Sequence, residues 1–93
     1  MKSIVQHEKE CFFTGETYDL HKHHIFFGNP GRKLSEKYGL TVYLVPYWHT
    51  TGPQAVHNCR KTDLILKQTA QRAFERVHGT REEFIKIFGR NYL

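Results

Sequence analysis

Apolar runs separated by polar and glycine-rich breaks divide the chain into a first half of short strands and a second half of helices. Residues 18–25 follow a Thr-Gly-Glu-Thr turn and predict a strand. After the Gly28–Gly31 break, residues 40–45 have the β-branched and aromatic content of a second strand, which Pro46 ends. We expect the two strands to pair as a hairpin whose long connection holds a loop or short helix near residues 32–37.

Three helices are predicted after the second strand. The first starts near residues 50–53, where proline suits a first turn, and it carries His57. The longest has Thr62 as a candidate N-cap and an apolar stripe at spacings of three and four, and it ends before Gly79. A Thr-Arg-Glu-Glu sequence then predicts a capping box for a last helix over residues 80–88. We expect the two C-terminal helices to act as structural support.

The chain length of 93 residues predicts a single domain, 1–93, with a limited core. Domains of this size often need a metal, disulfides or a partner. The two cysteines, Cys11 and Cys59, are too few for a disulfide framework, and no apolar segment follows Met1 that would act as a signal peptide or membrane span. We therefore expect a cytoplasmic protein without a membrane partner.

The net charge of +5, with a pI near 9.4, favours a polyanionic partner. Basic side chains release condensed counterions when they neutralise phosphates, which drives nucleic-acid binding. Charge that merely keeps the protein soluble is nearly as good an explanation of the charge alone. The choice between these two interpretations depends on the motifs.

Five of the seven histidines lie between residues 21 and 57. His21, His23 and His24 fall in the first predicted strand, and His49 and His57 follow the second. A single surface histidine usually does no more than titrate. Grouped neutral imidazoles, however, bind zinc and other first-row metals and move protons near neutral pH. The group therefore predicts a metal-assisted reaction.

The order of these features resembles the HNH endonucleases, a family with a ββα-metal fold. The resemblance lies in a strand ending in His-His-Ile, a loop, a second strand followed by a histidine, and then Gly-x-x-x-Val-His, within about residues 11–59. Residues 60–93 are similar to small phage and prophage members. The resemblance implies an α+β domain, a ββα-metal core with additional C-terminal helices, acting in a bacterial host cell. It also implies duplex or branched DNA as substrate and a phage protein as a candidate partner, with the oligomeric state left open.

The resemblance assigns roles to four histidines. His23, His49 and His57 match the metal ligands, and His24 matches the general base that takes a proton from the attacking water. One divalent ion, with Zn²⁺, Mg²⁺, Mn²⁺ and Ni²⁺ as candidates, and one base suffice for phosphodiester hydrolysis. The implied activity is a metal-dependent endonuclease that nicks or cuts DNA. The alternative is a non-catalytic, metal-stabilised nucleic-acid-binding module of a phage packaging or recombination assembly.

The adjacent pair poses a geometric problem, because successive side chains of a regular strand point to opposite faces. His24 would then point away from His23, so we expect a twist, bulge or strand end at the pair. His21 shares the face of His23. We expect it either to compete as a metal ligand or to form a hydrogen bond with a ligand without binding the metal itself.

The sequence departs from the family pattern at two places. The asparagine expected near residues 40–41 is missing, and Asn58 lies too late to align with it. Two Cys-x-x-Cys pairs often hold a second zinc, but here only Cys11 remains of them, so we expect apolar packing with Trp48 and neighbouring residues. Basic residues flank the predicted site and are candidates for phosphate contacts, with a solvated surface as the equal alternative: Arg32, Lys33, Lys37, Arg60 and Lys61.

Overall fold

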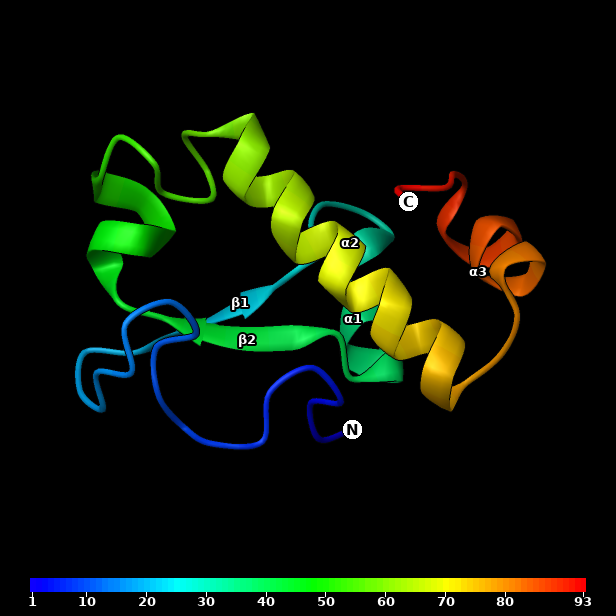
Figure 1. Ribbon diagram of the computed structural model, residues 1–93, viewed down its shortest axis with the longest axis horizontal. Coiled ribbons are helices and arrows are strands. Elements are labelled where there is room, and N and C mark those ends of the chain that lie inside the picture. The colour runs from blue at the N-terminus through cyan, green and yellow to red at the C-terminus, as the bar shows by residue number, and fades with distance from the viewer.

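The computed structural model describes all 93 residues and has an α+β architecture (Figure 1). Strands β1 (His21–His24) and β2 (Thr41–Leu44) form a two-stranded antiparallel sheet in which His23 lies opposite Val42. Helix α1 (Gly31–Tyr38) occupies the connection between them. The predicted hairpin with its long connection is therefore confirmed.

Strand β1 is shorter than the strand predicted over residues 18–25. Tyr18 is exposed, and Asp19 adopts a left-handed conformation with φ of 56°, which no strand contains. At the other end, the Ile25 N–H still donates to the Leu40 carbonyl oxygen, over 3.1 Å, but the ladder stops there. His24 is consequently the last residue of its strand.

The N-terminal segment covers the outer edge of β2. The Phe12 N–H donates to the Tyr43 carbonyl oxygen over 2.8 Å, and the Tyr43 N–H donates to the Gln6 side-chain oxygen over 2.8 Å. Cys11 and Tyr43 form an isolated parallel bridge. This segment satisfies backbone groups of β2 that would otherwise face solvent, whereas β1 forms backbone hydrogen bonds only with β2.

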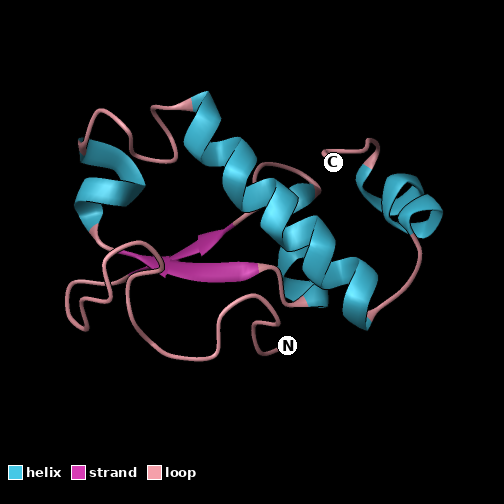
Figure 2. Ribbon diagram, in the orientation of Figure 1, coloured by secondary structure: helices cyan, strands magenta, loops and turns pink.

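The helices after β2 differ from the prediction at their start (Figure 2). The helix predicted from residues 50–53 is wrong: a π-helical turn, η1 (Tyr47–Thr51), comes earlier, and residues 53–58 form turns. The Gly52 N–H donates to the Tyr47 carbonyl oxygen over 2.9 Å, and a β-carbon at Gly52 would collide with that oxygen. Glycine at this position therefore allows the chain to close η1 and leave it.

Helix α2 (Arg60–Val77) begins at Cys59 as N-cap, so the predicted start at Thr62 is wrong by one short turn. Helix α3 (Arg81–Phe88) has the predicted capping box: the Glu83 N–H donates to Thr80 Oγ1, and the Thr80 N–H donates to the Glu83 carboxylate. None of the helices combines the length and the apolar character that a bilayer span requires.

The core lies between the sheet, α2 and α3. Leu66, Ala70 and Phe74 form the buried stripe of α2, and Phe84 of α3 is fully buried against Phe26 and Phe74, with ring centroids 5.7 and 5.4 Å away. Burying an aromatic side chain of this size stabilises the fold by about 1.5–3 kcal/mol. The C-terminal helices thus supply the packing surface expected of them.

Ser35 fixes helix α1 to the end of β1. Its hydroxyl is buried, accepts from the Phe26 N–H over 3.0 Å and donates to the Phe26 carbonyl oxygen over 2.8 Å. Two hydrogen bonds between one side chain and one backbone residue define the separation of α1 from the strand end. The next residue of α1, Glu36, is thereby held beside His24.

Candidate metal centre

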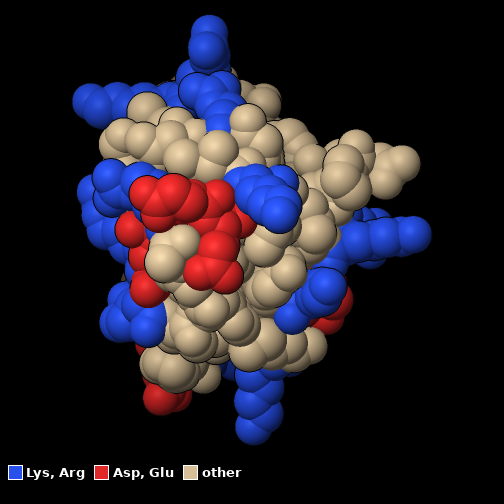
Figure 3. All heavy atoms as spheres, turned by 90° about the vertical axis from the view of Figure 1, so that its right-hand side faces the viewer, with Lys and Arg blue, Asp and Glu red and all other residues tan.

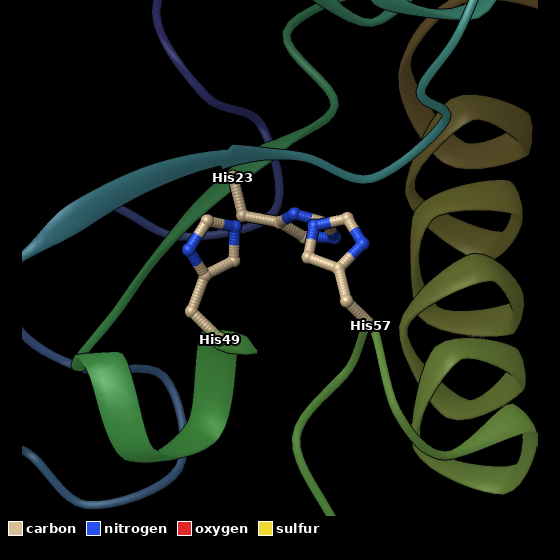
Figure 4. Close-up of side chains that lie close together, drawn as sticks. All are labelled: His23, His49 and His57. Atoms are coloured by element: carbon tan, nitrogen blue, oxygen red, sulfur yellow. The ribbon is translucent and has the colours of Figure 1, made fainter. Parts of the chain in front are cut away.

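Three histidines from three different segments converge on one point. His23 comes from β1, His49 from η1 and His57 from the turn before α2, and their rings face one another (Figure 4). One ring nitrogen from each lies within 4.8 Å of the other two. These are the three histidines that the sequence analysis expected to be ligands, and their arrangement is close enough to hold one metal ion.

Burial keeps two of these rings neutral. His23 is 2% exposed, and burial lowers its pKa to about 3, with further lowering from His49 and His57. The pKa of His49 is likewise lowered, to about 4. Burial is the largest cause, and the charges of His57 and His21 lower this pKa further. The charged form of an imidazole is disfavoured in such surroundings, so the lone pairs that a metal needs are free at neutral pH.

The buried Nε2 atom of His23 has no hydrogen-bond partner. Buried polar atoms of folded proteins are nearly always paired, and an unpaired one costs about 1–3 kcal/mol. A metal ion held by the three imidazoles would satisfy this atom. The residues present therefore fit a bound transition-metal ion.

His21 forms a hydrogen bond with His49, one of the three converging histidines. Its Nδ1 lies 2.9 Å from Nδ1 of His49, while His21 is not among the three converging residues. Because Nδ1 of His49 is engaged by His21, Nε2 is the atom that remains to face His23 and His57. Of the two roles left open for His21, this geometry favours the supporting one, which fixes the tautomer and orientation of a ligand.

The position of His24 at the end of its strand explains how the adjacent side chains of His23 and His24 can border the same cleft. His24 is the last residue of β1, and it lines the same cleft of about 450 Å³ as His23, His49 and His57. Its Nε2 lies 2.8 Å from Oε2 of Glu36 on α1. His24 therefore borders the three-histidine group without being part of it.

Glu36 also contacts Lys22, whose Nζ lies 3.1 Å from Oε1. The hydrogen bond from His24, and then that from Lys22, lower the pKa of the Glu36 carboxyl, so the carboxylate is ionised at neutral pH. Sequence reasoning missed Glu36, because nothing in the spacing of 12 residues between it and His24 signals a contact.

Two further clefts share lining residues with the cleft beside the histidines or with each other. The cleft beside the histidines shares Phe27 and His57 with a cleft of about 260 Å³, which in turn shares Arg60 and Asp63 with a third of about 440 Å³. We call the three together the basic groove. Its basic side chains are Lys22, Arg32, Arg60, Lys61, Lys67 and Arg90.

Of the five basic residues predicted to contact phosphates, three line the groove and two do not. Arg32, Arg60 and Lys61 line it. Lys33 and Lys37 line none of its three clefts, and Lys37 instead places Nζ over the Tyr38 ring, 5.4 Å from its centroid. Lys33 and Lys37 therefore lie outside the groove.

Lys67 and Arg90 are groove residues that sequence reasoning missed. Lys67 Nζ lies 2.8 Å from Asp63, the one acidic residue that lines the groove, and 4.8 Å from the Phe27 ring centroid. Arg90 lies over the Tyr92 ring near the chain end. Glu36 pairs with Lys22 and Asp63 pairs with Lys67, and the other four basic side chains leave the groove with an excess of positive charge.

Asn58 braces the two loops that carry His49 and His57. Its side-chain N–H groups donate to the carbonyl oxygens of Thr50 and Gly52, the second over 3.1 Å, which ties the His57 turn to the end of η1. Asn58 was not expected to contribute to the site, because it does not align with the asparagine of the HNH pattern that the sequence resembles. Its contacts nevertheless stabilise the positions of two converging histidines.

Cys11 and Trp48 take part in apolar packing, as expected. Cys11 is buried in the hydrophobic core, and the rings of Phe13 and Trp48 pack with centroids 4.7 Å apart. Aromatic contacts at this distance add to the stability gained from burial alone.

No family model matches the chain, and neither a curated protein nor a solved structure is significantly similar to it. The order of two antiparallel strands followed by helices is compatible with a ββα arrangement. Functional inference therefore depends on the geometry of the histidines and their surroundings.

Proposed function

We propose that this protein is a metal-dependent endonuclease that hydrolyses phosphodiester bonds of DNA. The proposal rests on one observation: a single cleft is lined by the three converging histidines and also by His24, which is not one of the three. A hydrolase of this type needs a metal site and a separate proton acceptor within reach of the same substrate atom. His23, His49 and His57 suit the first task, and His24 suits the second.

The donor set narrows the choice of metal. Three neutral imidazoles suit zinc and nickel, whereas magnesium prefers oxygen ligands in octahedral geometry. Zn²⁺ and Ni²⁺ are therefore better candidates than Mg²⁺ among the ions considered. When bound, the ion supplies Lewis-acid stabilisation of the charge that develops on the phosphate oxygens.

The residues of the chain perform the remaining steps. A water molecule in the cleft loses a proton to His24 while its oxygen forms a bond to phosphorus. The bond from phosphorus to O3′ breaks, its electron pair goes to O3′, and that oxygen takes up a proton from solvent. Arg32 lines the same cleft and is suited to binding a phosphate of the substrate.

The distribution of charge supports a nucleic-acid substrate. The basic groove leads away from the histidines along the start of α2. On the face shown in Figure 3, the acidic side chains form one small group with Lys and Arg side chains around it, and Glu82 and Glu83 lie in the first turn of α3. A polyanion is attracted to the groove, where basic side chains outnumber carboxylates.

Plasmid relaxation, assayed after removal of bound metal and addition of Zn²⁺, Ni²⁺, Mn²⁺ or Mg²⁺, tests the proposal. His24→Ala removes the proton acceptor but no converging histidine, so cleavage should fall by about 10²-fold or more while metal content and DNA binding persist. His23→Ala should instead lower metal affinity itself, and with it the thermal stability of the metal-loaded protein. His7→Ala, at an exposed site outside the cleft, is the matched control.

Equal loss of metal in the two variants, or cleavage by His24→Ala at the parental rate, would refute this division of roles. A parent protein that binds metal and DNA but cuts no DNA with any of the four ions would support the binding-module alternative instead.

A further inference from the structure

The Glu36 carboxylate connects α1 to the residue that we propose as the base. Its Oε2 lies 2.8 Å from Nε2 of His24, and its Oε1 lies 3.1 Å from Nζ of Lys22. The backbone of α1 is fixed at this point by Ser35, whose buried hydroxyl forms both of its hydrogen bonds with Phe26. The contact between Glu36 and His24 therefore belongs to a part of the fold with a defined separation.

This contact selects one of the two forms of the neutral His24 ring. A neutral imidazole carries one N–H, and an ionised carboxylate accepts hydrogen bonds but donates none. The hydrogen atom must therefore lie on Nε2, where Glu36 accepts it, and the lone pair lies on Nδ1. Nδ1 of His24 forms no hydrogen bond with the protein and is free to accept a proton from a water molecule.

We propose that Glu36 is the positioning residue of His24: it holds the Nε2–H tautomer and the ring orientation in which Nδ1 faces the cleft. This inference rests on the proposed endonuclease function for its catalytic consequence. Partners that orient a metal-bound histidine typically contribute about 10–100-fold to metal affinity or activity when they are tested by mutation, and we expect an effect of that size for the partner of His24.

The competing explanation is an ordinary surface ion pair that attaches α1 to β1. The Glu36 side chain is 46% exposed, and exposed ion pairs contribute about 0–1 kcal/mol to stability. Because Ser35 already attaches α1 to Phe26, removing the Glu36 carboxylate should leave the fold intact. The two explanations then differ in what happens to the His24 ring.

Three variants separate them. Glu36→Ala removes the acceptor, Glu36→Gln keeps an amide oxygen that can accept from Nε2–H without the charge, and Lys22→Ala removes the other partner of Glu36 while leaving His24 paired. The tautomer of His24 is read from its side-chain ¹⁵N shifts in the zinc-loaded protein at about pH 8, where an ordinary imidazole is neutral. The kcat and KM for oligonucleotide cleavage are measured on the same samples.

In the parent and in Lys22→Ala, His24 should show a single Nε2–H tautomer. Glu36→Ala should yield a mixture of tautomers and a kcat lowered about 10–100-fold, with KM changed less than twofold, and Glu36→Gln should recover most of both properties. A parental tautomer and kcat in Glu36→Ala would overturn the inference, as would an Nδ1–H tautomer in the parent. The ¹⁵N shifts need no activity, so a parent that fails to cleave would contradict the proposed function while the tautomer still decides the role of Glu36.

Discussion

Acid should destabilise the metal-free protein, because burial keeps two of the converging histidines, His23 and His49, in their neutral form. The pKa of His23 is lowered from 6.5 to about 3, so below pH 6.5 the unfolded chain binds a proton at this residue that the folded chain does not. Stability from this group is complete above pH 6.5 and is lost as the pH falls from there toward 3. At 1.36 kcal/mol per pKa unit, lowering the pH from 7.5 to 5 should cost about 2 kcal/mol for His23 alone.

His49 acts in the same direction, since its pKa is lowered to about 4, but it is only partly buried and contributes less. Urea unfolding followed by circular dichroism, in the presence of a chelator between pH 7.5 and 5, measures the loss. For a domain of 93 residues, about 2 kcal/mol corresponds to a decrease in Tm of about 8–16 °C.

His23→Leu, which cannot titrate, should be about 2 kcal/mol less sensitive to the same pH change than the parent. His7→Asn, at an exposed histidine, should keep the parental pH dependence. If the parent and His23→Leu lost equal stability between pH 7.5 and 5, the argument from burial of the neutral ring would be refuted.

Three further substitutions test the fold and the groove. Ser35→Ala leaves the buried Phe26 backbone groups without a partner and should lower the free energy of unfolding by about 1–3 kcal/mol in urea titrations; no loss would contradict the assigned bonds. Thr80→Ala removes the capping box of α3 and should cost about 1 kcal/mol, seen as a lower Tm. Arg90→Ala should weaken DNA binding and reduce the salt slope by about 1, whereas Arg76→Ala, on α2 outside the groove, should change neither; equal effects would exclude the groove as the binding path.

Local sequence patterns predicted those elements whose causes are local. The capping box at Thr80 involves residues three positions apart, and β2 was predicted from the β-branched and aromatic content of its own residues. The helix predicted to start near Pro53 was wrong, although Gly-Pro after two threonines is typical of a helix start. Its conformation is instead set by the close approach of Gly52 to Tyr47 and by the bracing contacts of Asn58.

The histidine cluster was recognisable from the sequence because imidazoles are few and their grouping is conspicuous. The partners of these histidines were not. His21 meets His49 across 28 residues and Glu36 meets His24 across 12, and both contacts exist only once the hairpin has formed and α1 has docked. Hydrogen bonds between distant side chains leave no periodic signal in the chain, so their discovery requires the fold.

The hydrogen-bonding pattern of the small sheet has a consequence for association between chains. The N-terminal segment covers the outer edge of β2, which leaves β1 as the edge with free backbone groups. An unprotected edge strand can pair with a strand of another molecule and start aggregation, and charged side chains on the edge are a common defence. Lys22, exposed in the middle of β1, supplies such a charge, so the four residues that carry His23 and His24 also guard the molecule against strand addition.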